Sequence, residues 1–331
     1  MKTRKLFVLP AICCALALTL GACGEGKQEN GESEAEMKER LKEEVRAEIA
    51  AEMKAEAEAK AKAEAEARAR AAEQKAAEEK ALAEKKAAEA RARARAAVES
   101  RAKLILDGTM VIGVTDKNMT SCVIPHGITS IEEKAFEGCS SLTSLTIPDS
   151  VTSIGDGAFR GCKNLTSITI PDSVTSIGEW AFSGCSSLTS ITIGNGVTSI
   201  GHAAFSGCEK LTSVTIGNGV MSIENSAFSD CSSLTSITIG NGVTSIGYTA
   251  FSGCKKLTSI TIPDSVTSIG NNAFSFCSNL VLVTVGKGVT SIGEGAFDGC
   301  SSLKRLTIPA KFTDEDVKKW DVPSNCKVIR R

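Results

Sequence analysis

The sequence is poor in aromatic residues and in histidine. Phe, Trp and Tyr together account for 4% of the 331 residues, and only two His and one Tyr are present. So few candidates for acid–base or metal chemistry argue against an ordinary enzyme. An excess of one charge is also missing, because 38 Lys plus Arg face 39 Asp plus Glu. This balance gives no broad electrostatic reason to bind nucleic acid.

Residues 1–22 have the pattern of a secretory signal. A basic start precedes an apolar run over residues 6–20, which is too short to span a bilayer comfortably. The ending Leu20-Gly21-Ala22-Cys23 resembles the lipobox of bacterial lipoproteins, which implies cleavage before Cys23 and lipidation of that residue. Gly24 in place of Asp implies, by resemblance to enteric bacteria, an outer-membrane destination. The alternative is an ordinary cleaved signal followed by a chance Cys.

The next two segments predict a flexible tether and a helical spacer. Residues 23–32 are polar and rich in Gly after the Cys, as in flexible linkers. Residues 33–100 consist largely of Ala, Glu, Lys and Arg without Gly or Pro, which predicts a long exposed helix. Ser33 and Glu36 have the spacing of a capping box, and pairs such as Glu56 with Lys60 contribute about 0.2–0.5 kcal/mol each.

A coiled coil is the alternative for this segment. The apolar residues of its first part recur every four positions, not at the 3.5 average of a heptad: Met37, Leu41, Val45, Ile49 and Met53. Over residues 55–69 Ala alternates with charged residues, so no hydrophobic seam continues. We therefore favour a single helix, with weak self-association near residues 37–53 as the alternative. Residues 24–103 carry 19 basic and 20 acidic side chains, which disfavours a nucleic-acid-binding arm.

From residue 123 onward the sequence repeats every 23 residues. One column of the repeat is Phe: Phe136, Phe159, Phe182, Phe205, Phe228, Phe251, Phe274 and Phe297. A second column, three residues later, is Cys: Cys139, Cys162, Cys185, Cys208, Cys231, Cys254, Cys277 and Cys300. Eight copies in register predict a solenoid in which each unit stacks on its neighbours. These two columns are the expected structural core.

One unit can be interpreted in physical terms. Ile168 and Ile170 are apolar around Thr169, the alternation of a strand whose Thr faces solvent. The following Pro171-Asp172-Ser173 has the composition of a turn, and Gly184 can supply a left-handed residue before the next Cys. A single unit cannot offset its backbone entropy of about 1–2 kcal/mol per residue, so the units must share a core.

This register resembles the BspA-like leucine-rich repeats (LRR_5 type) of bacterial surface proteins. The shared signature is Ala-Phe-x-Gly-Cys-x-x-Leu-x-x-Ile-x-Ile-Pro-x-x-Val-x-x-Ile-Gly, over residues 123–308. The resemblance implies a curved β-rich solenoid, an extracellular location and adhesion to matrix proteins, other bacteria or cell surfaces. It implies no catalytic residues.

Residues 101–122 and 309–331 are expected to cap the two ends of the array. Trp320, Cys326 and Ile329 each lie 23 residues after an apolar repeat position, which indicates a degenerate last unit. Charged residues between positions 311 and 319 predict a short helix there. Cys122 lies 23 residues before Leu145 and is expected to occupy an inward strand position. Polar caps of this kind cover the open ends of repeat arrays.

The cysteines invite a chemical interpretation. Ten remain after the signal and Cys23 are set aside, and no Cys-x2-Cys spacing typical of zinc sites occurs. We favour Cys as a small buried apolar residue that fills one layer of the core, with disulfides between some neighbours as the alternative. His126 and His202 lack obvious partners, so neither a metal site nor a catalytic site is predicted.

Two surfaces are candidates for binding. One is the strand face, where Ser and Thr such as Ser167 and Thr169 form rows of hydroxyls. The other is the variable pair before each Ala-Phe, which supplies five candidate ligand-binding residues: Trp180, His202, Asn225, Tyr248 and Asn271. Exposed aromatic residues are typical anchors at interfaces. The alternative is that both faces are merely solvated.

The sequence therefore predicts a non-enzymatic, lipid-anchored cell-surface adhesin or protein-interaction module without a cofactor or metal. Its expected location is the bacterial envelope, in the outer membrane and exposed at the surface. Its expected partners are extracellular matrix or cell-surface proteins, with the membrane reached through the lipid and no nucleic acid bound. One alternative is a structural envelope lipoprotein that spans the periplasm. A remoter one is binding of ice or polysaccharide by the Ser/Thr rows.

Overall fold

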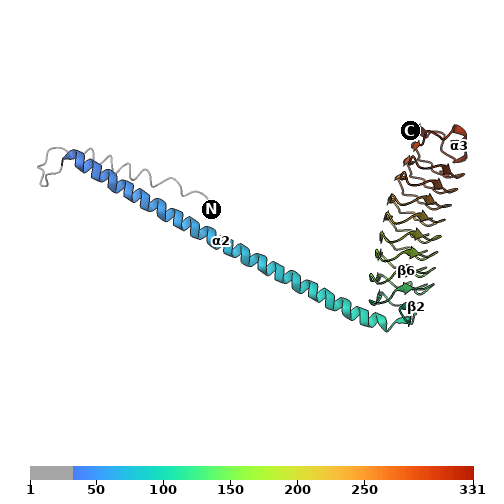
Figure 1. The fold of residues 1–331 in the computed structure, drawn as a ribbon, viewed down its shortest axis with the longest axis horizontal. Helices are drawn as coiled ribbons and strands as arrows, with labels where there is room; N and C mark the ends of the chain where they lie inside the picture. Colours follow the sequence, from blue (N-terminus) through green and yellow to red (C-terminus); the bar gives the residue numbers. More distant parts are fainter. Residues whose placement is uncertain (1–32) are drawn as a thin grey trace. The chain divides into compact units, whose positions relative to one another are not determined.

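A computed structural model describes residues 33–331 (Figure 1). The predicted signal, the lipidation site Cys23 and the tether lie outside the described residues. The chain divides into two units at residue 85, and the second unit contains the end of the long helix together with the repeats. The fold class predicted from the sequence is confirmed, since a long α-helix precedes a β-rich solenoid with a repeat of about 23 residues.

Helix α2 extends over Glu34–Arg101, 68 residues in all. It begins with the capping box expected from the sequence: the Ser33 N–H donates to Glu36 Oε2 at 2.9 Å, and the Glu36 N–H donates to Ser33 Oγ at 3.4 Å. The Ser33 N–H and the Ser33 hydroxyl both donate to the Glu36 carboxylate, which lowers the pKa of that carboxyl. The apolar side chains Met37, Leu41, Ile49 and Met53 are exposed. Local interactions along the helix, not a buried face, therefore support this segment.

Each solenoid turn contributes a short strand and a longer strand. The short strands follow the β1–β2 hairpin in a ten-stranded sheet, here called sheet A, whose members are β1 Leu104–Asp107, β2 Met110–Val114, β4 Ser130–Ile131, β6 Ser153–Ile154, β8 Ser176–Ile177, β10 Ser199–Ile200, β12 Ser222–Ile223, β14 Ser245–Ile246, β16 Ser268–Ile269 and β18 Ser291–Ile292. Apart from the antiparallel β1–β2 pair, neighbouring strands are parallel and in register, so that Ser199 lies between Ser176 and Ser222.

The longer strands form two separate sheets. Sheet B has six strands: β3 Ser121–Val123, β5 Ser144–Thr146, β7 Ser167–Ile170, β9 Ser190–Ile193, β11 Ser213–Thr215 and β13 Ser236–Thr238. Sheet C has four: β15 Ser259–Thr261, β17 Leu282–Thr284, β19 Arg305–Ile308 and β20 Lys327–Arg330. No strand pairing joins β13 to β15, whereas sheet A continues from β14 to β16 across the same turns. Between consecutive turns of sheet B, a Thr hydroxyl donates to a Thr carbonyl of the preceding turn, as Thr235 does to Thr212. Among the described residues, no such hydrogen bond crosses the junction between β13 and β15.

The Phe column forms the centre of the core. All eight rings are fully buried, and successive rings stack with centroids 5.0–5.9 Å apart and planes within 20° of parallel. Each of the six inner rings therefore contacts the Phe rings of both neighbouring turns, an arrangement that contributes dispersion and apolar burial at every interface. The Phe228 N–H also donates to the Ala250 carbonyl of the next turn at 2.8 Å, which fixes the return segment to its neighbour.

Two backbone positions of each turn have positive φ. At the first, six turns carry Gly, as Gly184 does with φ +71°, and the other two carry Asp230 and Phe276. At the second, two residues before each Phe, most side chains are not Gly, and Trp180 has φ +52°. A separate glycine column permits close stacking, because a Cβ on Gly178 would lie 2.6 Å from the Asp156 nitrogen. Gly therefore predominates in this column, although Glu132 and Glu224 also occupy it.

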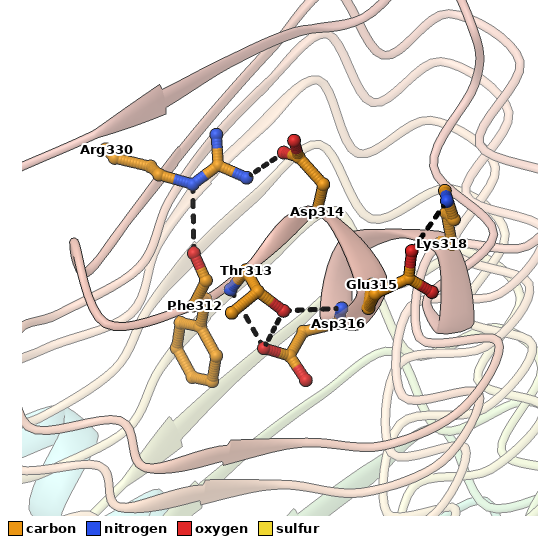
Figure 2. Close-up of polar contacts among 7 residues, drawn as sticks. All are labelled: Phe312, Thr313, Asp314, Glu315, Asp316, Lys318 and Arg330. Atoms are coloured by element: carbon orange, nitrogen blue, oxygen red, sulfur yellow. Dashed lines mark hydrogen bonds and ion pairs between the residues drawn. The ribbon is translucent and has the colours of Figure 1, made fainter.

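Polar caps close both ends of the second unit. At the amino-terminal end, the Val123 N–H of β3 donates to the buried Ser100 Oγ at 2.9 Å. At the carboxyl-terminal end, the predicted short helix is α3, Asp314–Lys319, which begins with a capping box between Thr313 and Asp316 (Figure 2). Arg330 of β20 donates to the Phe312 carbonyl at 2.9 Å and forms an ion pair with Asp314, also drawn in Figure 2.

The 23-residue spacing predicted for Ile329 is wrong. Val328 pairs with Leu306, and Ile329 pairs with Thr307, so the register between β19 and β20 is 22 residues. The cause is that α3 replaces the irregular return of the earlier turns. Trp320 nevertheless closes the core, since it is 2% exposed and its indole N–H donates to the Ile292 carbonyl at 3.0 Å.

Candidate interaction surfaces

The variable pair before each Ala-Phe brings Trp180 and His202 into contact. Their rings meet edge to face, with centroids 5.3 Å apart and an interplanar angle of 86°. The left-handed backbone at Trp180 turns the chain at this corner, and the Trp180 N–H donates to the His202 carbonyl at 2.8 Å. The indole remains 39% exposed. This pair can offer a large apolar and polarisable contact to a partner, as interface anchors do.

Tyr248 and the two candidate Asn residues have different roles. Tyr248 is 50% exposed. Asn225 Oδ1 accepts the Tyr248 N–H at 2.8 Å, and Asn271 Oδ1 accepts the Glu294 N–H at 3.1 Å. Both amide oxygens thus bridge consecutive turns, a structural use that the sequence analysis did not foresee. The aromatic side chains of this corner are therefore exposed, and the side-chain carbonyls of Asn225 and Asn271 hold the backbone of the following turns.

The hydroxyl rows of sheet B are exposed along the strand face. Ser167 and Thr169 of β7 face solvent, while Ile168 and Ile170 between and after them are buried. A neighbouring row is already engaged: Thr166, Thr189 and their equivalents donate to the carbonyl of the preceding turn at 2.8–3.2 Å. In the described part of the chain, no hydrogen bond engages the side chains of Ser167 and Thr169. These are the hydroxyls that remain available to a ligand.

The Cys column is buried and has a defined hydrogen-bonding role. Each thiol from Cys162 to Cys300 donates to the carbonyl of the Phe 26 residues earlier, with Sγ–O distances of 3.1–3.4 Å. No disulfide joins the ten cysteines between Cys122 and Cys326. Burial raises the pKa of the Cys185 and Cys231 thiols to about 12. Protonated thiols in an apolar layer are poor nucleophiles.

No catalytic constellation is found among residues 33–331. No cluster of three or more His, Cys, Asp or Glu in this range could hold a metal ion. A pocket of about 520 Å³ lies between turn residues Asn241 and Asp264 and the terminal Arg331. Asp264 Oδ1 already accepts the Lys287 N–H at 2.7 Å, and Arg331 donates to the Val285 carbonyl at 3.4 Å. The pocket is therefore built from groups that hold turns together.

Three exposed apolar residues of the seventh unit were not predicted as functional residues. Phe276, Val281 and Leu282 are 58%, 38% and 37% exposed. They occupy columns where most other units carry Gly, Thr and Ser, respectively. Their departure from the repeat was the signal available in the sequence.

Parallel, in-register stacking of 23-residue units on a Phe core, with strands on two faces, defines a leucine-rich-repeat solenoid. The family model described as "BspA type Leucine rich repeat region" matches residues 115–235 and 198–317, with six copies. Together these matches cover more than half of the sequence, so the chain belongs to the BspA-type leucine-rich repeat family.

The chain is also similar to solved structures of leucine-rich repeat proteins. A leucine-rich repeat protein from Bacteroides ovatus is 30% identical, with a TM-score of 0.59, over 65% of this chain and 55% of that protein. A leucine-rich repeat protein from T. pallidum is 28% identical, with a TM-score of 0.48, over 66% of this chain and 90% of that one. The chain thus matches little more than half the length of the Bacteroides ovatus protein. A search of curated proteins finds no match.

No helix within residues 33–331 contains a stretch that is both long enough and apolar enough to cross a bilayer.

Proposed function

We propose that this protein is a lipid-anchored interaction module, displayed at the bacterial cell surface, that binds matrix or cell-surface proteins through its solenoid. The single observation that carries the proposal is the exposed aromatic corner, where Trp180 meets His202 edge to face and Tyr248 is half exposed two turns beyond His202. Large aromatic side chains held on a rigid repeat scaffold suit the energetics of a protein interface. Lipidation of Cys23 would attach the chain to the membrane, with α2 as a spacer.

The same features support no catalytic function. The buried thiols are protonated and engaged with carbonyls, and His202 packs against an indole instead of a nucleophile or carboxylate. Repeat solenoids of this family are typically non-enzymatic, and the chemistry of the described surfaces is that of a binding protein.

The first experiment tests display. Intact cells that express the protein are treated with an added protease, and the loss of the solenoid is followed with an antibody against it. We expect loss from intact cells for the wild type and release into the medium for Cys23→Ser. Protection in intact cells, with digestion only after the envelope is opened, would instead support a structural lipoprotein within the periplasm.

The second experiment tests the aromatic corner on the same cells. Trp180→Ala together with Tyr248→Asn introduces side chains that Ala203 and Asn225 already carry in the same columns, so the fold should persist. We expect adhesion to immobilised matrix proteins to fall about tenfold or more, as for loss of interface anchors. Met221→Thr, which removes another exposed apolar side chain and restores the repeat residue, is the matched control. Equal adhesion of all three proteins would contradict the proposal for this corner.

A further inference from the structure

The outer face of sheet C differs chemically from that of sheet B. The outward positions of sheet B are predominantly hydroxyls, as at Ser190 and Thr192 of β9. At one outward position, β15 carries Ser259, β17 carries Leu282, β19 carries Arg305 and β20 carries Lys327. Each of these residues pairs with the next one across the sheet. This column of outward side chains therefore starts with a hydroxyl and continues with an apolar residue and two cations.

The column beside it changes in the same way. Thr258 is followed by Val281 and then by Lys304, and consecutive members are joined by backbone hydrogen bonds of 2.8 and 3.0 Å. Phe276 adds a third apolar side chain at the corner that leads into β17. Its ring reaches toward the next turn, because a Cβ on Gly299 would lie 2.7 Å from the Phe276 ring. We call these residues the sheet C patch: Phe276, Val281, Leu282, Lys304, Arg305 and Lys327.

Phe276 occupies a position that disfavours it. Its φ is +58°, in a column where six turns carry Gly, and its side chain is 58% exposed. A bulky residue in the left-handed region is strained, and exposure recovers little apolar burial. Neither the fold nor the core explains this choice of residue. Strain of this kind at an exposed site favours a role in recognition.

The cations of the patch are uncompensated. Lys304, Arg305 and Lys327 are exposed, and none of them forms an ion pair with another residue in the range 33–331. Lys255 and Lys256 add two more exposed, unpaired cations at the corner before β15. The nearby Asp298 meets the patch through its backbone carbonyl, which accepts the Phe276 N–H at 2.7 Å. The patch is therefore apolar at its centre and basic on both sides.

From this arrangement we infer that the sheet C patch binds an acidic polypeptide segment that also carries apolar or aromatic side chains. Carboxylates complement the basic flanks, and apolar side chains of the partner complement Phe276, Val281 and Leu282. Sulfated glycans would match the charges but leave the apolar centre uncovered. An anionic lipid surface fits less well, because the patch belongs to a pleated sheet whose neighbouring rows are hydroxyls. This inference names the partner class for the interaction module proposed above and rests on that proposal.

The probe is a synthetic copolymer of Glu and Tyr, compared with poly-glutamate, heparin and phosphatidylglycerol vesicles. Binding is measured on the purified chain carrying Cys23→Ser, so that no lipid interferes. The apolar variant is Phe276→Gly with Val281→Thr and Leu282→Ser, and the charge variant is Lys304→Thr with Arg305→Ser. Every replacement restores the residue that most other units carry in that column, so each variant should fold. Met221→Thr and Lys163→Ser with Lys210→Ser are matched controls elsewhere on the solenoid.

We expect the wild type to bind the copolymer more tightly than poly-glutamate. The apolar variant should lose about tenfold for the copolymer and little for poly-glutamate. The charge variant should lose about tenfold for both at low salt, and the difference should shrink as salt is added. The control variants should bind like the wild type.

Three results would overturn the inference: equal binding of the copolymer by the wild type and both patch variants, tighter patch-dependent binding of heparin, or patch-dependent binding of the vesicles alone. These measurements use a purified protein and a defined probe. Failure of surface display or of matrix adhesion would therefore be recognised separately.

Discussion

The two regions of the molecule are stabilised over different distances in sequence. At the start of α2, side chains interact with neighbours three positions away, as Lys42 does with Glu39 at 3.0 Å. In the solenoid, the thiols bond 26 residues back and the strands pair 23 residues away. The helix is therefore stabilised by the sum of weak local interactions, whereas the stability of each solenoid turn depends on its neighbours. The effect of a substitution in the helix should therefore remain local, whereas the effect of one in the solenoid should spread to neighbouring turns.

The largest effect should come from the Phe column. Phe228→Ala removes a fully buried ring that stacks on Phe205 and Phe251, and should destabilise the solenoid by about 3–5 kcal/mol. Urea unfolding followed by Trp fluorescence measures this loss, because both Trp residues lie in the solenoid. The helical circular dichroism signal that remains after the fluorescence transition should not change. An unshifted fluorescence transition would show that the Phe column is not a shared core.

The next effect is a dependence on pH that only the solenoid should show. Burial raises the pKa of the Cys185 and Cys231 thiols from the ordinary 9.0 to about 12. The stability that these protonated thiols supply is fully present below pH 9 and is lost as pH rises from 9 toward 12. At pH 10 the loss is on the order of 1 kcal/mol for each thiol.

Replacing both thiols tests this assignment. In Cys185→Ala with Cys231→Ala, the difference in unfolding free energy between pH 8 and pH 10 should be smaller than in the wild type by an amount on the order of 2 kcal/mol. Fluorescence-monitored unfolding in a reducing buffer at the two pH values gives the number. Folded wild-type thiols should also react slowly with alkylating agents until urea is added. An identical pH dependence in both proteins would contradict the burial of these thiols.

A smaller and strictly local effect is expected at the start of α2. Ser33→Ala removes the side-chain acceptor of the capping box and should cost about 1 kcal/mol in the first turn. Hydrogen exchange of the first helical amides should accelerate, while Ser33→Asp should retain most of the protection. Trp fluorescence unfolding should be unchanged by either substitution. A shift of that transition would mean that the helix start and the solenoid unfold together.

The smallest effect concerns a single exposed ion pair. The Lys42 ammonium, through its hydrogen bond and its charge, lowers the pKa of the Glu39 carboxyl. Lys42→Gln should therefore raise that pKa toward its ordinary value, which an NMR titration of the Glu39 side chain can detect. The unfolding of both regions should remain as in the wild type, because exposed pairs contribute little to stability. An unchanged Glu39 titration would show that the pair does not form in solution.

Periodicity made most of the fold predictable. The inward alternation of Ile168 and Ile170, the strand position of Cys122 opposite Leu145 and the capping box at Ser33 all follow from patterns within one unit or between equivalent positions. The register of Ile329 did not follow, because the count of 23 assumes that every turn has the same return. Helix α3 breaks that assumption.

The candidate surfaces were less predictable than the fold. Trp180 and His202 differ by 22 positions, and only the left-handed backbone at the corner brings their rings together. The use of Asn225 Oδ1 by the next turn depends on a side-chain geometry that composition does not specify. The role proposed for Phe276 did not follow from the repeat, because the period predicts the residues that units share and Phe276 departs from its Gly column.

The interruption between β13 and β15 has a mechanical consequence. A module held at one end and bound to a partner at the other carries tension along its stack of turns. On one face, no strand pairing joins β13 to β15 and resists their separation. On the other face, β14 and β16 remain paired. Pulling should therefore bend the stack open at this seam before it unravels a turn. The solenoid would yield as a hinge, with sheet C and its patch moving as one block.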